Sequence, residues 1–295
     1  MLAKQLPMRL LPNSQIELVE PYCFLLQLCV HTNKVPNLGI SYYICNMRYR
    51  MRLSYDGADF CGWQIQPDAP SVQGRLEEAL SMLLRCTIAV TGAGRTDSGV
   101  NASDYIAHFD CENALDCQQL CYKLNAILPD SISITSIEEA NSDFHARFSA
   151  KHREYKYYLH RGKAPFLEKY SYRWPYPELD IEAMNRAAQQ LLGTHDFSCF
   201  EKSGGDNKTS ICTIFQAEWH KYCPQQGSEG ECWYFHIAAD RFLRNMVRAI
   251  VGTLLEIGRG KRAEGSIEEL IRSQDRCQAG QSVPGHALFL TKIEY

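Results

Sequence analysis

The chain has 295 residues, of which 45% are hydrophobic and 22% charged, and its formal net charge is −3. This composition is typical of a globular protein with one or two domains, and it excludes a chain too polar to build a core. The net charge gives no sign of nucleic-acid binding, but two segments are locally basic. Residues 147–173 hold eight Lys or Arg against two Glu, and residues 240–262 hold six against two acids. These segments are either solvated faces or the walls of a basic cleft.

Thirteen cysteines are scattered along the chain. The closest pair, Cys117 and Cys121, has no histidine or second cysteine pair nearby that would complete a zinc site. Unpaired thiols at irregular spacing suit a reducing compartment, so we expect a cytoplasmic protein in which most cysteines are small buried residues. We expect no metal site.

The first 46 residues differ from the rest. Their apolar run, 21–30, is too short to span a bilayer. Glu17 and Glu20 stand just before this run, which does not suit a signal peptide. We therefore expect residues 1–46 to be a poorly ordered extension, a candidate for a wrongly assigned start, and we expect no contact with a membrane.

Regular patterns begin at Met47. Residues 48–55 alternate strictly, with tyrosine, methionine and leucine on one side and arginine or serine on the other, which predicts a half-buried strand. Ser71 and Asp180 are expected to cap helices, and Gly193 to end the second of them. Strands are predicted at 48–55, 105–110, 131–140, 153–161, 211–220, 232–239 and 287–295, and helices at 71–85, 115–127, 181–192, 241–257 and 266–273. This mixture predicts an α+β fold, with a mostly antiparallel sheet covered by helices on one face.

The predicted helix at 241–257 would carry Arg241, Arg244 and Arg248 in an arc of about 60° beside its apolar stripe. Like charges at this spacing repel one another. Either an anionic partner compensates them, a phosphate or a protein carboxylate, or the three residues form an ordinary solvated face.

The stretch TGAGRTDSGVNAS, residues 91–103, is a glycine-rich turn with two opposite charges, Arg95 and Asp97. An aspartate in such a turn often caps backbone amides. As a metal ligand Asp97 would lack partners, because the loop holds no other Asp, Glu or His. As a nucleophile it would need no general base, because an aspartate carboxylate is normally ionised at neutral pH, and the glycines leave room for a substrate.

The residues GRTDSGVNA, 94–102, resemble the signature of the TruA family of tRNA pseudouridine synthases. Five further segments resemble other parts of that family in the right order: 55–64, 71–80, 143–159, 191–200 and 242–260. The resemblance runs from about Met47 to the end of the chain. Two positions depart from the usual signature, since Ser98 replaces an alanine and Asn101 replaces a histidine. These departures could alter loop packing or substrate contacts.

The resemblance implies a pseudouridine-synthase-like fold of two similar α/β subdomains, 47–147 and 148–295, with a central active-site cleft. It implies isomerisation of uridine to pseudouridine in the anticodon stem-loop of tRNA, at positions 38–40, by a homodimer without a cofactor. Asp97 would be the nucleophile, Tyr155 would stack on the target base, and Arg248 would form an ion pair with Asp97. Arg95 would contact RNA. The other candidates for phosphate contacts are Arg147, Lys151, Arg153, Arg241 and Arg244. The alternative is a catalytically silent RNA-binding protein of the same fold.

Overall fold

The computed structural model describes residues 46–176, 178–204, 208–224 and 231–295. Apart from Asn46, the predicted N-terminal extension lies outside these residues. The described residues belong to one compact unit.

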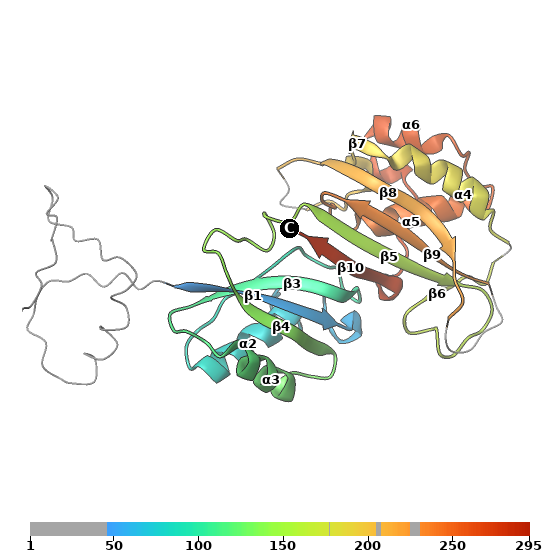
Figure 1. The fold of residues 1–295 in the computed structure, drawn as a ribbon. Helices are drawn as coiled ribbons and strands as arrows, with labels where there is room; N and C mark the ends of the chain where they lie inside the picture. The colour runs from blue at the N-terminus through green and yellow to red at the C-terminus, as the bar shows by residue number, and fades with distance from the viewer. Residues whose placement is uncertain (1–45, 177, 205–207, 225–230) are drawn as a thin grey trace, which may run out of the picture. The chain divides into compact units, whose positions relative to one another are not determined.

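This unit is built on a single ten-stranded sheet (Figure 1). The strands follow the order β4-β1-β3-β10-β5-β9-β8-β7, with β2 paired to β3 and β6 paired to β5. Their bounds are β1 Met47–Tyr55, β2 Val90–Gly92, β3 Asn101–Cys111, β4 Ile132–Ala140, β5 His152–His160, β6 Tyr172–Arg173, β7 Gly193–Asp196, β8 Ile211–Lys221, β9 Cys232–Ala239 and β10 Leu288–Glu294. The helices are α2 Val72–Leu84, α3 Cys117–Ile127, α4 Ile181–Ala188, α5 Met246–Gly258 and α6 Ser266–Ser273. The predicted α+β fold is confirmed.

Strand β10 lies in the middle of the sheet. It pairs in parallel with β3, where Leu290 is opposite Ala102, and antiparallel with β5, where Leu290 is opposite Tyr155. The sheet therefore continues from one predicted subdomain into the other, and the boundary at 147/148 stays a prediction.

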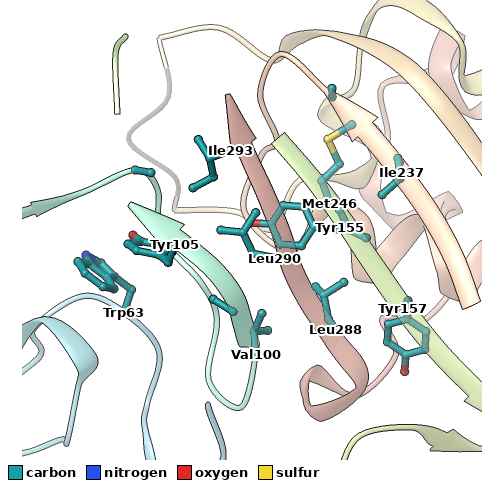
Figure 2. Packing of buried hydrophobic residues seen from close by; sticks show 14 of the residues in the cluster. Trp63, Val100, Tyr105, Tyr155, Tyr157, Ile237, Met246, Leu288, Leu290 and Ile293 are labelled. Atoms are coloured by element: carbon teal, nitrogen blue, oxygen red, sulfur yellow. The ribbon is translucent and has the colours of Figure 1, made fainter. Parts of the chain in front are cut away.

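One face of this sheet is buried over the five neighbouring strands from β1 to β9. A single row of paired residues runs over it, from Tyr55 through Ala102, Leu290 and Tyr155 to Ile237, and every member is buried. Figure 2 shows how the side chains of this face pack. Because cross-strand partners point to the same side of a sheet, the row defines one continuous core beneath the helices.

The opposite face of the N-terminal half is charged. The arginines that alternate with the buried residues of β1 each pair with an acid on a neighbouring strand: Arg48 with Asp110, Arg50 with Glu138 and Arg52 with Asp104. The period-two pattern in residues 48–55 thus separates the core from a paired, solvated surface, as the sequence predicted.

Two helix boundaries differ from the prediction. The helix expected at 181–192 ends at Ala188 and continues as a short 3-10 turn, Gln189–Leu191, while Gly193 begins β7. The helix expected at 241–257 begins only at Met246, because Asn245 has a left-handed φ of 64°. Arg241 and Arg244 therefore lie before the helix, and the predicted three-arginine stripe does not exist. The short strands β2, β6 and β7 were not predicted.

Candidate active site

The candidate site is centred on the loop between β2 and β3, which carries Arg95 and Asp97. Several backbone contacts fix this loop. The Thr96 carbonyl accepts a hydrogen bond from the Trp63 amide at 3.2 Å, and the Thr96 hydroxyl lies 2.9 Å from that of Tyr55. Gly62 permits this close approach, because its φ is 97° and a Cβ at this position would lie 2.3 Å from the Thr96 oxygen.

An aromatic pair stands behind the loop. The rings of Trp63 and Tyr105 stack with their centroids 4.2 Å apart (Figure 2). The Tyr105 hydroxyl donates to the carbonyl of Gly94, whose amide donates back to this hydroxyl at 3.3 Å. The segment just before Asp97 is therefore held by buried side chains rather than left as a mobile turn.

Asp97 forms an ion pair with a residue 151 positions away. Its Oδ2 accepts a hydrogen bond from Nη1 of Arg248 at 3.0 Å. The two side chains are 25% and 22% exposed, so the pair is only partly shielded and one side of the carboxylate stays open to a substrate. Sequence reasoning expected this pairing from the resemblance alone, since no spacing rule connects the two positions.

The left-handed residue before α5 places Arg248 in the first turn of that helix. The Asn245 side chain donates to the Ser282 hydroxyl at 2.6 Å, which fixes the start of the helix. Arg248 then donates from Nε to the Val283 carbonyl at 2.8 Å. The guanidinium is thus held on one edge by the backbone and presents the other edge to Asp97.

Tyr155 lies on β5, where it is 9% exposed. Its ring packs edge-on against Phe242, with the centroids 5.1 Å apart, and Figure 2 shows it beside Leu290. The pKa of Tyr155 is raised to about 12, mainly by burial; the charge of Arg153 opposes this rise and the charge of Asp97 adds to it. The hydroxyl therefore keeps its proton at neutral pH. We call Asp97, Tyr155 and Arg248 the site centre.

Arg153, two residues before Tyr155, donates to four carbonyls from three segments. Its Nη1 donates to the carbonyls of Ala150 and Asp240 at 3.3 and 2.6 Å. Its Nη2 donates to those of Ala93 and Arg147 at 3.2 and 2.7 Å. Since Ala93 begins the Asp97 loop, this one guanidinium holds that loop, the turn before β5 and the turn after β9 together. Its assignment as a phosphate contact stays a prediction, but most of its donors already have backbone partners.

Comparison with known proteins decides the family. The family described as tRNA pseudouridine synthase matches residues 187–295. The tRNA pseudouridine synthase A of Bacteroides thetaiotaomicron is 52% identical over 248 residues, which cover 84% of this chain and 90% of that protein. That of Bacteroides fragilis is 49% identical over 84% of this chain and 96% of its own length, and that of Bacillus subtilis is 38% identical over 84% and 99%. The chain belongs to the TruA family of tRNA pseudouridine synthases.

The two departures from the TruA signature both form hydrogen bonds within the protein, although Ser98 is exposed. Asn101 is buried; its oxygen accepts from the Gly57 amide at 2.8 Å, and its nitrogen donates to the His286 carbonyl at 2.7 Å. Ser98 donates weakly to the Phe60 carbonyl at 3.4 Å. Of the two effects considered from the sequence, these contacts favour loop packing.

The other basic residues predicted for RNA contact in this TruA protein fall into two groups. Arg95 and Arg147 are exposed and line one cavity of about 130 Å³ beside the loop. Lys151 and Arg244 are also exposed, and Arg241 is half-buried, but none of the three lines this cavity. Their role in RNA binding stays a prediction.

Sequence reasoning missed the turn that carries Arg147. His108 is buried and accepts a hydrogen bond from the Ala146 amide at 3.2 Å, and burial lowers the pKa of His108 to about 4. Next to Arg147, the ring of Phe148 is 75% exposed. The only sequence signal was a large apolar residue inside a basic segment.

Among the residues that the structure describes, no cluster of three or more His, Cys, Asp or Glu side chains is placed to hold a metal ion. Within the same residues, no helix combines the length and hydropathy needed to cross a bilayer.

Proposed function

We propose that this protein isomerises uridine to pseudouridine in tRNA, with Asp97 as the nucleophile. The observation that carries the proposal is the Asp97–Arg248 ion pair, 3.0 Å long and partly open, beside a buried tyrosine ring. The names of the relatives, tRNA pseudouridine synthase A, support the reaction class.

The reaction breaks the C1′–N1 glycosidic bond, turns the uracil and joins C5 to C1′. The proton on C5 leaves and N1 gains one, so atoms balance without oxidation or hydrolysis, and no cofactor is required. A carboxylate suits the step at the sugar, because it attacks or accepts a proton without a general base. Arg248 orients Asp97 and compensates its charge while substrate excludes water.

A uridine inside folded RNA must leave its stack to reach Asp97, which costs a few kcal/mol. Stacking on an aromatic side chain returns about 1–3 kcal/mol. Tyr155 suits this task, because it interacts electrostatically with Asp97 and its protonated hydroxyl adds no negative charge there.

Tritium release from tRNA labelled at C5 of uridine tests the proposal, because the C5 proton is lost only if the base is isomerised. We expect release by the native protein and none by Asp97→Asn, which keeps the size and polarity of the side chain but not its charge. The variant should still bind tRNA. Binding without release by the native protein would instead favour a catalytically silent RNA-binding protein, and an active Asp97→Asn would remove Asp97 as nucleophile.

Three finer points belong to the same proposal and are supported by the family resemblance. The targets are uridines 38–40 of the anticodon stem-loop, the enzyme works as a homodimer that binds one tRNA across both subunits, and it acts in the cytoplasm. Mapping pseudouridines in tRNA from a deletion strain tests the first, sedimentation with and without tRNA the second, and fluorescence imaging of the tagged protein the third.

A further inference from the structure

Phe148 is a large apolar side chain that is exposed to solvent beside the candidate site. It is 75% exposed, although burial of such a ring is strongly favourable. It directly follows Arg147, whose guanidinium carbon lies 5.5 Å from the ring centroid. The ring also contacts that of His145, with the two centroids 4.3 Å apart.

The backbone that carries this ring is fixed. The amides of Arg147 and Phe148 both donate to Nδ1 of His145, at 3.1 and 3.3 Å. The Ala146 amide donates to buried His108 at 3.2 Å. A ring displayed by a rigid turn loses little conformational entropy when a ligand packs on it, so the turn is suited to binding.

The same turn is tied to the loop of Asp97. Nη2 of Arg153 binds the carbonyls of both Arg147 and Ala93, so these two backbone segments are neighbours. Between them lies the cavity of about 130 Å³ lined by Arg95 and Arg147. Two arginines at a cavity provide the charge and geometry that a phosphate requires.

We propose that Phe148 and Arg147 form a stacking subsite for an unpaired base next to the target uridine, with the connecting phosphate between Arg147 and Arg95. The inference rests on the proposed function, since a flipped target leaves its neighbours without a stacking partner. An aromatic ring interleaved with basic side chains is the usual composition of a site for single-stranded nucleotides.

A protein partner is the competing occupant of an exposed ring. The charges next to Phe148 favour RNA, because the cavity of Arg95 and Arg147 contains no acidic side chain in its lining. The nearest acidic group of the turn, Asp143, instead lines a separate cavity with Glu138 and Glu139.

The test measures binding of unmodified tRNA by Phe148→Ala, Phe148→Leu and Phe148→Trp. Alanine and leucine should each weaken binding roughly tenfold, the loss of one stacked base, while tryptophan should stay close to native. Tyr122→Ala is the matched control, because Tyr122 is also 75% exposed but lies on α3, which packs on the edge strand β4. It should bind tRNA as the native protein does.

A second readout identifies the base. With 2-aminopurine placed at each neighbour of the target in turn, fluorescence at one position should be quenched by the native protein and recover with Phe148→Ala. Native binding by Phe148→Ala or by Phe148→Leu would overturn the stacking subsite, and so would a changed oligomeric state with unchanged tRNA affinity. In each of these cases, tritium release by the native protein would still support the proposed function. Absence of release would contradict that function, whatever the result for the Phe148 variants.

Discussion

The site centre is largely buried, whereas three residues near it, Arg95, Arg147 and Phe148, are exposed; we call these three the rim. In the centre, Asp97 and Arg248 are about one quarter exposed and Tyr155 is 9% exposed. On the rim, Arg95 and Arg147 are exposed and Phe148 is 75% exposed. Electrostatic effects are strong where water is largely excluded and weak where it is not.

This difference separates chemistry from binding. A fixed charge pair in the centre acts on the reacting sugar, so its loss should lower the rate constant at saturating tRNA. Solvated cations and an open ring on the rim act on the RNA before reaction, so their loss should weaken affinity. Substitutions at three positions can break or sharpen this separation.

Arg248→Met should give the largest effect of the three. It removes the charge that orients Asp97, together with the bond to the Val283 carbonyl. We expect single-turnover tritium release at saturating tRNA to fall by about 10²–10³, the usual cost of one charge-stabilising group. The rate of Arg248→Lys should lie between those of the native protein and the methionine variant, because a lysine ammonium lacks the planar guanidinium that binds both partners at once. A methionine variant with native turnover would contradict the assignment of Arg248 to the centre.

Tyr155 should show a smaller loss that depends on its ring. Tyr155→Ala should lower the rate by roughly tenfold or more, because one base-stacking contact is lost, while Tyr155→Phe should lose less. Because the pKa of Tyr155 is about 12, its hydroxyl stays protonated from about pH 7 to about pH 9. The pH–rate profiles of native protein and Tyr155→Phe should therefore be parallel in that window. An equally large loss of rate in Tyr155→Ala and Tyr155→Phe would assign the effect to the hydroxyl.

Arg153→Lys tests whether centre and rim are independent. Arg153 binds the carbonyls of Ala93, on the side of Asp97, and of Arg147, on the rim. Lysine cannot reach four carbonyls, so both the rate at saturation and the affinity for tRNA should fall, each by several-fold. Arg50→Lys is the control, since Arg50 pairs with Glu138 on the opposite face and surface pairs contribute about 0–1 kcal/mol. Loss of affinity alone would place Arg153 with the rim.

The regular elements were predictable because local rules govern them. Strict alternation of buried and exposed residues located β1. The side chains of Ser71 and Asp180 cap their helices as expected, because they accept hydrogen bonds from the amides of Gly74 and Ala183. Such signals use only residues within one turn or one pleat of each other.

The start of α5 was not predictable in this way. Residues 241–245 continue the apolar periodicity of the helix, but Asn245 adopts a left-handed conformation stabilised by Ser282, a contact across 37 positions. No local pattern reports such a contact. The same holds for Arg153, whose partners come from three segments, and for the pairing of Asp97 with Arg248, which only the family resemblance suggested.

The central place of β10 has a consequence for the order of events during synthesis. Residues 288–294 come late in the chain, yet they lie between β3 and β5 and bring Leu290 beside Tyr155. A growing chain therefore carries its aspartate loop and its tyrosine long before the strand that unites them. We infer that the nascent protein has no assembled site until β10 has been made and inserted, so premature termination upstream of this strand yields no active enzyme.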